Sequence, residues 1–502
     1  MLNDKTQISG KKVLNNMLWR FAERVGAQGV NFLVSVVLAR ILTPEDYGVI
    51  ELASIFTTIL AVFMTAGLGT ALIQRKEIDD LDCSTALVGN IGIGIILYGV
   101  VFFSAPYIAQ FFRQPLIKNV LRVLALTLVI GGVNGIQHAK VARSMQFKLF
   151  FKATITGTVL SAIVGIWLAV KGFGVWAIVA QHLTNQIIDT VFLSVIIKWK
   201  PSFRFSWVRF KPLCAYGSQA YGAQLIETVY NSLRSLLIGR YYTGTDLAYY
   251  NRGRHIPALV NYNTNHAIQS VMFPTYSKVA DDPEKFKKMM RRAISMGTFI
   301  IFPCMMGLAV VSSTLIDTIY TSKWLPATPY LQIACFVYAL NPLHVVNLQA
   351  ILALGKSNIS LRIEIIKKTI AITTMIICIH ISLFVTAFSA IPLGIMALIV
   401  NSWPIGKYIK YTLFEQLKDS VPAFLLSIIM GVFVWLLGMI DIHNVPKLIL
   451  QITGGIGSYC LFAKLSRNKD YDYIKEYLIS FFRKHITRNY LQSQEGEKEG
   501  HE

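Results

Sequence analysis

Long apolar stretches recur along almost the whole chain. The chain has 502 residues, of which 54% are hydrophobic and only 15% are charged. Soluble domains carry about 25% charged residues, so this chain lacks the charge to cover a water-exposed surface. About 20 apolar residues in helical form span a bilayer, because backbone exposed to lipid must satisfy its hydrogen bonds internally. The sequence therefore predicts an all-α polytopic membrane protein.

Fourteen membrane-spanning helices are predicted. The first span keeps charged residues near its start and lacks a cleavage pattern, so we expect a retained helix rather than a cleaved signal peptide. The shortest connection is a turn near Ser389-Ala390-Ile391-Pro392. The predicted spans are 17–39, 47–72, 83–104, 118–136, 151–170, 174–197, 213–238, 255–277, 293–316, 328–353, 369–386, 387–406, 420–440 and 445–463.

The basic residues indicate the orientation of these helices. The formal net charge is +21, which in a soluble protein favours nucleic acid as a partner. If the N-terminus is cytoplasmic, 35 of the 48 Lys and Arg residues lie on the cytoplasmic side, 10 lie outside and three lie within spans. Membrane proteins show this bias because it sets their orientation. We therefore expect both termini in the cytoplasm, basic loops at anionic lipid headgroups and no nucleic-acid binding.

An internal repeat appears at an offset of 200 residues. The segments NFLVSVVLARILTPED and NSLRSLLIGRYYTGTD share 6 of 16 positions without a gap. This alignment superposes the first span on the seventh, together with the loop after each. The recurring residues are Asn31, Leu33, Ser35, Arg40, Thr43 and Asp46, which return as Asn231, Leu233, Ser235, Arg240, Thr243 and Asp246.

The repeat predicts two six-helix lobes. The N-lobe covers 1–198 and the C-lobe 213–408, joined by a basic cytoplasmic linker at 199–212. Two extra helices follow at 409–465, and 466–502 forms a cytoplasmic amphipathic helix with a polar, disordered end. Parallel six-helix repeats around a central site are a transporter design that permits alternating access.

Several motifs resemble a known family. The sequence is similar to polysaccharide-transport flippases, the Wzx-like members of the multidrug/oligosaccharidyl-lipid/polysaccharide (MOP) exporter superfamily, which has a MATE-like fold. The matching segments are LNNMLWR at 14–20, LARILTPEDYG at 38–48, IAQFF at 108–112, GRYY at 239–242, LAYYNR at 247–252 and FPTYS at 273–277.

The resemblance implies a function and a location. Such proteins move an undecaprenyl-pyrophosphate-linked oligosaccharide across the bacterial plasma membrane by alternating access. The product is used for capsule, exopolysaccharide or O-antigen (lipopolysaccharide) synthesis. The implied partners are the lipid-linked oligosaccharide, membrane lipids, and the polymerase and glycosyltransferases of the pathway. H⁺ or Na⁺ is the implied coupling ion.

Polar faces on the first and seventh spans supply candidate binding residues. Ionisable groups inside a span are costly and so mark functional sites, and guanidinium groups match phosphate oxygens. For the two arginines near the start of the first span, snorkelling to headgroups is the alternative. The cavity candidates are Arg20, Arg24, Gln28 and Asn31 on the first span and Glu227, Asn231 and Arg234 on the seventh.

Further candidates lie on the eighth and sixth spans. Aromatic and amide side chains suit sugar hydroxyl groups, although a packed interhelical face is the alternative. A carboxylate can hold a coupling ion; ion pairing with the arginines is the alternative role of Glu23 and Glu227, and joining the helices of the N-lobe is the alternative role of Asp189. The sugar candidates are His255, Tyr262, His266 and Gln269, the outer phosphate candidates are Arg252 and Arg254, and the coupling-ion candidates are Glu23, Glu227 and Asp189.

The sequence carries no enzymatic signature. It has no Walker A motif, catalytic constellation or metal-ligand spacing, so we expect no enzyme, cofactor or metal. The six cysteines form no CxxC pair and are interpreted as buried apolar residues. Two alternatives remain: a drug/cation antiporter of the same superfamily, and a polytopic glycosyltransferase or polymerase. The arginines on the first and seventh spans favour an anionic substrate and so disfavour the antiporter. The outer loops are short, whereas a glycosyltransferase or polymerase generally needs a long one.

Overall fold

The described part of the chain is built from helices. The computed structural model describes residues 10–65, 67–75, 77–197, 202–476 and 480, and this part contains no β-strand. The predicted all-α class is therefore confirmed. Local hydrogen bonds fix several helix starts. At Thr412, for example, the hydroxyl group accepts from the Glu415 N–H while the Glu415 carboxylate accepts from the Thr412 N–H, which is a capping box.

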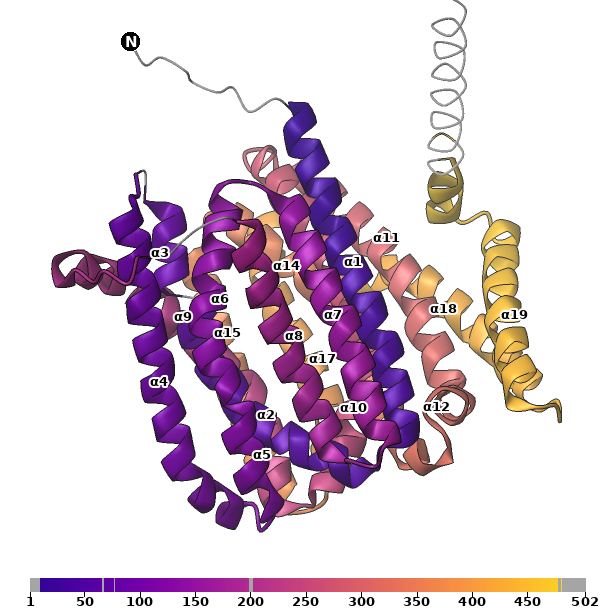
Figure 1. The fold of residues 1–502 in the computed structure, drawn as a ribbon. Helices are drawn as coiled ribbons and strands as arrows, with labels where there is room; N and C mark the ends of the chain where they lie inside the picture. Colours follow the sequence, from indigo (N-terminus) through magenta and orange to yellow (C-terminus); the bar gives the residue numbers. More distant parts are fainter. Residues whose placement is uncertain (1–9, 66, 76, 198–201, 477–479, 481–502) are drawn as a thin grey trace, which may run out of the picture. The chain divides into compact units, whose positions relative to one another are not determined.

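Two compact units divide the chain between Tyr249 and Tyr250. The six-plus-six division of the sequence at 198–213 stays a prediction. The helices of the first unit are α1 (Gly10–Ile41), α2 (Pro44–Thr65), α3 (Leu68–Gln74), α4 (Asp80–Phe111), α5 (Leu116–Leu124), α6 (Leu126–Arg143), α7 (Phe147–Val170), α8 (Val175–Ile196) and α9 (Trp207–Tyr241), followed by the first turns of α10 (Gly244–Ser277) (Figure 1).

The second unit contains the rest of α10 and the helices that follow it. They are α11 (Pro283–Val310), α12 (Ser312–Tyr320), the 3₁₀ helix η1 (Ser322–Ala327), α13 (Thr328–Ala339), α14 (Asn341–Ala353), α15 (Ser357–Ile379), α16 (Leu383–Phe388), α17 (Ala390–Ile409), α18 (Leu413–Gly438) and α19 (Asn444–Leu465).

Each predicted span coincides with one helix or with consecutive helices. The span predicted at 47–72 is divided into α2 and α3, and that at 328–353 into α13 and α14. The short turn expected near Ser389–Pro392 lies at Ser389, since α16 ends at Phe388 and α17 begins at Ala390. A second break, which was not predicted, lies between α15 and α16, around Ile381. Pro392 itself is in the first turn of α17, where backbone N–H groups have no helical partner and proline is tolerated.

Nine helical segments of the described chain are long and apolar enough to cross a membrane. Among the described residues, helices α8, α9, α10 and α15 do not meet this criterion, and the apolar part of α1, Val25–Ile41, is too short for it. Of these, α9 and α10 carry polar faces predicted to bind substrate, which lower their hydropathy. The protein is a multi-pass membrane protein. Its most polar helices are those for which the sequence predicts a transport role.

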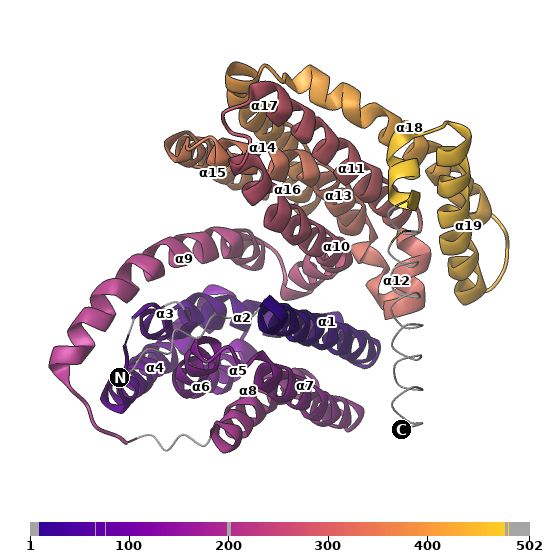
Figure 2. The same cartoon turned by 90° about the horizontal axis from the view of Figure 1, so that it is seen from above.

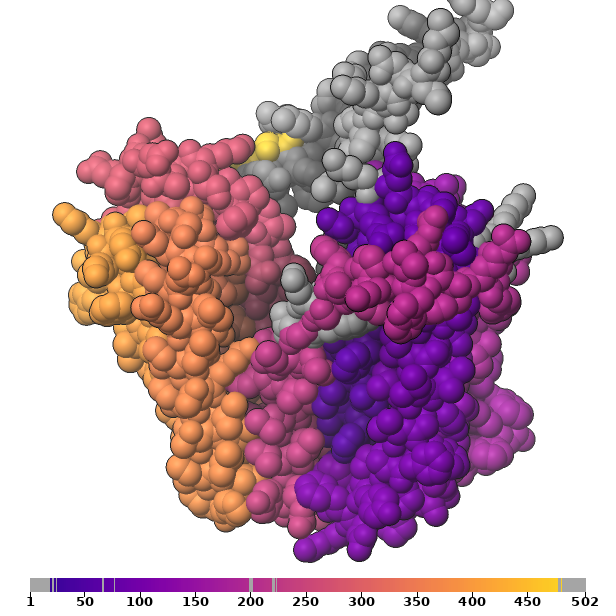
Figure 3. All heavy atoms as spheres, turned by 90° about the vertical axis from the view of Figure 1, so that its left-hand side faces the viewer, coloured from indigo at the N-terminus to yellow at the C-terminus, as the bar shows by residue number. Residues whose placement is uncertain are grey.

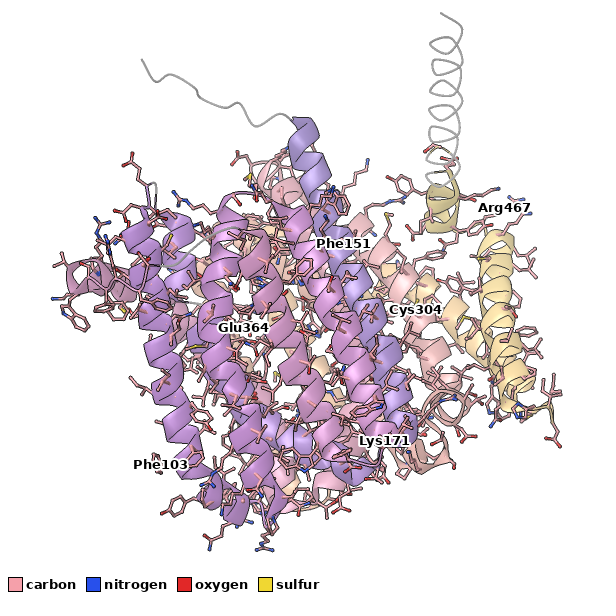
Figure 4. All side chains as sticks on the ribbon, in the orientation of Figure 1. Phe103, Phe151, Lys171, Cys304, Glu364 and Arg467 are labelled. Atoms are coloured by element: carbon pink, nitrogen blue, oxygen red, sulfur yellow. The ribbon has the colours of Figure 1, made fainter. Side chains whose placement is uncertain are left out.

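Small residues allow close helix packing in the first unit. Helix α7 packs against α1 and α8, and α4 against α6 (Figure 2). A Cβ atom on Gly94 of α4 would lie 2.8 Å from the Leu128 carbonyl oxygen of α6. The Asn90 amide donates to the Gly132 carbonyl at 3.0 Å. Such contacts associate helices in lipid, where apolar burial gives little driving force. On the outer side of α4, Phe103 points away from the bundle and is 75% exposed (Figure 4).

Polar side chains tie the helices of the second unit together. Helix α18 packs against α11, and α19 packs against α18 (Figure 2). The Arg291 guanidinium of α11 donates two hydrogen bonds to the Asp419 carboxylate of α18, at 2.8 and 2.7 Å. The Tyr411 hydroxyl donates to the same carboxylate at 2.7 Å. Deeper in the unit, the side-chain amides of Asn347 and Gln416 are fully buried and bond to each other.

The two repeat segments have the same local geometry. Thr43 donates to the Asp46 carboxylate through its N–H at 3.0 Å and its hydroxyl at 2.8 Å, and its hydroxyl accepts from the Asp46 N–H. Thr243 makes the same three hydrogen bonds with Asp246. Both threonines therefore cap the start of the helix that follows, so the two repeat segments match in cap geometry as well as in sequence.

Candidate substrate-binding residues

The predicted polar face of α1 is described in part. The side chains of Arg20 and Arg24 lie outside the described residues. Gln28 is half-buried and Asn31 is exposed. The carboxylate of Glu23, a predicted coupling-ion residue, accepts a hydrogen bond from the Thr154 hydroxyl of α7 at 3.3 Å. Glu23 thus contributes to the packing between α1 and α7, and its coupling role stays a prediction.

On α9 the predicted residues lie on one side, as their spacing indicates. The Asn231 amide donates to the Glu227 carboxylate at 3.2 Å. The side chains of Glu227 and Asn231 are exposed on the surface of the protein, whereas that of Arg234 is half-buried. Glu227, Asn231 and Arg234 follow one another at intervals of four and three residues, so they form one continuous polar strip on the helix.

The predicted sugar-binding face of α10 has aromatic and amide members. Tyr262 and His266 meet edge to face, with ring centroids 4.5 Å apart, and both are exposed, as is Gln269. His255 is half-buried. A neighbouring residue of the same helix, Asn261, accepts a hydrogen bond from the Asn341 amide of α14 at 2.6 Å. The helix thus combines exposed aromatic groups with amides that bind other helices.

The two arginines predicted to receive phosphate are packed against aromatic side chains. The Arg252 guanidinium lies 5.0 Å from the Tyr320 ring and 5.1 Å from the Trp324 ring, and the residue is 8% exposed. The Arg254 guanidinium donates to the hydroxyl groups of Tyr250 and Tyr338 at 2.9 and 3.1 Å. These contacts give both arginines a structural role in the second unit, and their phosphate role stays a prediction.

The polar side chains of α8 bind neighbouring helices. The Asn185 amide donates to the Ser161 hydroxyl of α7 at 3.3 Å, and the Gln186 amide donates to the Thr127 carbonyl of α6 at 2.9 Å. Asp189 accepts from two α6 residues that the sequence reasoning missed, Asn134 and His138. Their spacing of four residues on an apolar helix was the available signal, because it places both on one face.

The basic linker is fastened to the first unit. It is described from Ser202 onward, where its magenta atoms lie on the surface of that unit (Figure 3). The Ser202 and Ser84 hydroxyls lie 2.9 Å apart. The Arg209 guanidinium binds the carboxylates of Asp79 and Asp82 at 2.6 and 3.2 Å. Hydrogen bonds from the Asp82 N–H and from Arg209 lower the pKa of Asp79 below its ordinary value.

Comparison with known proteins agrees with the sequence resemblance. The profile of the family described as "Polysaccharide biosynthesis protein" matches residues 37–329. The succinoglycan biosynthesis transport protein ExoT of Rhizobium meliloti is 24% identical over 64% of this chain and 66% of its own length. The lipopolysaccharide biosynthesis protein WzxC of Escherichia coli is 23% identical over 73% of this chain and 75% of its own length.

A solved structure has a similar fold. The lipid II flippase MurJ, in an inward closed conformation, superposes with a TM-score of 0.72 at 17% identity. The superposition covers 90% of this chain and 98% of that one. The expectation of a MATE- or MOP-like helical fold is confirmed. Since the family profile covers more than half of the chain, the protein belongs to the polysaccharide biosynthesis protein family.

Proposed function

We propose that this protein moves an oligosaccharide linked to a polyprenyl diphosphate from the inner to the outer leaflet of a bacterial plasma membrane. The family match carries the proposal. The names of the relatives support it, because ExoT is named as a succinoglycan transport protein and WzxC as a lipopolysaccharide biosynthesis protein. The protein is a transporter rather than an enzyme.

The polar helices supply the chemistry that such a substrate needs. A diphosphate requires cations, and guanidinium groups bind phosphate oxygens through two parallel hydrogen bonds. We assign this role to Arg234 on α9, together with Arg20 and Arg24 on α1. Sugar rings require aromatic faces and hydrogen-bonding groups, which Tyr262 and His266 supply on α10. Arg252 and Arg254 would receive the diphosphate on the outer side.

Deletion and complementation test this function. In a strain that lacks the gene, lipid-linked repeat units should accumulate in the inner leaflet and polymer export should stop. Arg234→Ala should reproduce most of this defect, whereas Arg234→Lys, which retains the charge, should restore part of the export. Arg204→Ala in the exposed linker is the matched control and should export normally. Normal polymer export in the deletion strain would refute the proposal.

The orientation has a separate test. We infer that both termini are cytoplasmic, with the Ser322 turn outside and Ser202 inside. A cysteine at Ser322 should react with a membrane-impermeant maleimide in intact cells, and one at Ser202 only after permeabilisation. Each cysteine should be placed in a background that lacks the six native ones. The reverse labelling pattern would overturn the orientation.

A further inference from the structure

The chain turns back on itself after α19. A second helix, the tail helix, follows α19 and covers 469–476. Arg467 lies in the turn between the two helices, where it has a left-handed backbone with a φ of 50° (Figure 4). The Asn468 side-chain oxygen then accepts from the backbone N–H groups of Asp470 and Tyr471, at 2.9 and 3.3 Å. This cap fixes the start of the tail helix and therefore its direction.

The tail helix is attached to α11 through one buried acidic side chain. Asp470 is only 6% exposed, and its Oδ1 atom lies 3.4 Å from the Arg292 Nη1 atom of α11. The Ser295 hydroxyl of α11 donates to the other carboxylate oxygen, Oδ2. The Arg292 guanidinium also lies 4.2 Å from the centroid of the Tyr473 ring, which is close enough for a cation–π contact. Two side chains of the tail helix thus bind the same arginine of α11.

Burial distinguishes Asp470 from the other acids of the tail helix. Asp472 and Glu476 are exposed, as is usual for charges on a solvated helix. A carboxylate is costly to remove from water unless a cation and hydrogen-bond donors replace the water, and Arg292 and Ser295 supply both. A helix that only rested beside α11 would have no reason to bury a charge there. The position of Asp470 therefore indicates a specific attachment.

Helix α11 binds the segments on both sides of α19. Lys287 and Arg291 bind carboxylates near the start of α18, and Arg292 binds the tail helix. Between these two attachments in the chain, the Tyr459 hydroxyl of α19 donates to the Phe299 carbonyl of α11 at 2.8 Å. Burial of apolar side chains gives helices in lipid little driving force to associate. Polar contacts of this kind therefore decide whether α19 stays beside α11.

The start of α19 is fastened separately. The Asn444 amide, in the first turn of α19, donates to the Asp317 carboxylate of α12 at 2.5 Å. Helix α19 is thus held at its start by Asn444, within its length by Tyr459 and at its end by the tail helix. If the tail helix came away from α11, the start of α19 would stay fixed and its end would be free to move.

We propose that the tail helix is a strap that holds the end of α19 to α11, so that α11, α18 and α19 move as one rigid group. The strap is a lasting attachment, because both oxygens of its buried carboxylate are bonded. Without Asp470, the Arg292 side chain, already 40% exposed, would turn to water and leave the tail helix unattached. The importance of the strap for transport rests on the proposed function, because alternating access is largely a rigid-body movement of helix groups.

Disulfide trapping in isolated membranes tests the attachment. Ser295→Cys and Asp470→Cys, combined in a full chain that lacks the six native cysteines, should form a disulfide on mild oxidation. The two native side chains are in hydrogen-bond contact, which brings their Cβ atoms near the separation that a disulfide needs. Ser295→Cys with Asp472→Cys is the matched control, since Asp472 lies on the exposed side of the same helix. No cross-link in the first pair, or equal cross-linking in both, would overturn the strap.

Distances between spin labels test what the strap holds. Labels at the exposed positions Lys288 of α11 and Lys475 of the tail helix, in the full chain in lipid bilayers, should give one narrow distance distribution. Asp470→Ala should replace it by a broad one, whereas Asp472→Ala, which removes the same charge, should leave it narrow. A narrow distribution in both variants would contradict the proposal.

A second pair of labels separates release of the strap from general unfolding. Labels at Lys288 of α11 and Lys418 of α18, both exposed, should keep a narrow distribution in Asp470→Ala, because α18 has its own ion pairs with α11. A broad distribution for this pair as well would show that the substitution does not act on the end of α19 alone, and would overturn the proposal.

Export measurements test the use of the strap in transport. At equal amounts of protein in the membrane, Asp470→Ala should lower polymer export at least about five-fold, the lower end of usual coupling between distant sites. Asp472→Ala should export normally. Export by Asp470→Ala at or above the wild-type level would refute the role in transport, even if the labels showed that the strap was released. Normal export in the deletion strain would instead refute the proposed function and leave the attachment itself untouched.

Discussion

Gly48 of α2 and Gly244 at the start of α10 meet backbone to backbone. A Cβ atom on Gly48 would lie 2.3 Å from the Gly244 carbonyl carbon and oxygen, whereas one on Gly244 would lie 3.4 Å from the Gly48 Cα and carbonyl carbon. The contact joins the helix that follows the first repeat segment to the helix that follows the second. Backbone atoms cannot rotate away as a side chain does, so the Gly244 backbone leaves no room for a methyl group on Gly48. A methyl group on Gly244 has the room that it needs.

This asymmetry predicts different costs for two similar substitutions. Gly48→Ala should destabilise the protein by about 1–3 kcal/mol, because the helices must separate to admit the methyl group. Gly244→Ala adds a methyl group in ordinary van der Waals contact and should change stability by less than about 1 kcal/mol. Thermal unfolding in detergent measures both. Gly92→Ala, which has no neighbour within 4 Å, is the control, and equal loss in both test variants would contradict the geometry.

The repeated helix caps predict equal effects in the two repeat segments. Thr43→Ala and Thr243→Ala each remove the hydroxyl group that accepts from the N–H of the following aspartate. Each should cost about 1 kcal/mol, as is usual for the loss of an N-cap side chain. Chemical unfolding of the two variants provides the comparison. Thr43→Ser and Thr243→Ser keep the hydroxyl group and should behave like the wild type. A loss confined to one segment would show that the caps are not equivalent.

The attachment of the linker should depend on pH in the acidic range. Folding lowers the pKa of Asp79. The stabilisation that its carboxylate gives to the attached linker is therefore present above the ordinary aspartate pKa and is lost as the pH falls through the pKa of the folded protein. A spin label at Val208, an exposed position in the linker, should give the same spectrum between pH 5 and 8 and become more mobile below about pH 4. Asp79→Asn should make the label mobile at every pH. An unchanged spectrum in this variant would exclude the proposed role of Asp79.

The Arg291–Asp419 pair should contribute measurably to the second unit. Its arginine side chain is 48% exposed and its aspartate 15%, so solvent screens the pair and Arg291→Ala should cost only about 1 kcal/mol. Arg291→Lys keeps the charge but loses the bidentate geometry, so its stability should lie between that of the wild type and that of Arg291→Ala. The control is Lys285→Ala, which removes an exposed pair with Asp282 and should change stability by less than about 0.5 kcal/mol. Thermal unfolding of the three variants should give that order, and a larger loss from the control would contradict it.

Helical periodicity was enough to predict the relations within single helices. The apolar spans predicted the helices, since a backbone in lipid has few alternatives. The spacing of Glu227 and Asn231 predicted their shared face, and the structure joins them by a hydrogen bond. The same holds for Tyr262 and His266. The repeat in the sequence likewise predicted equivalent positions, and Thr43 and Thr243 cap their helices in the same way.

Contacts between helices were decided by the tertiary structure. His138 and Asp189 are 51 residues apart, and nothing in either helix alone indicates that their side chains meet. Arg252 was predicted as a phosphate ligand, and nothing in the sequence indicates that its guanidinium lies against the rings of Tyr320 and Trp324. The physical reason is that helical geometry fixes which residues of one segment share a face, whereas the partner of that face depends on close packing among distant segments. The sequence alone determined the class, the repeat and the family resemblance of this protein, and the packing determined which polar groups form a site.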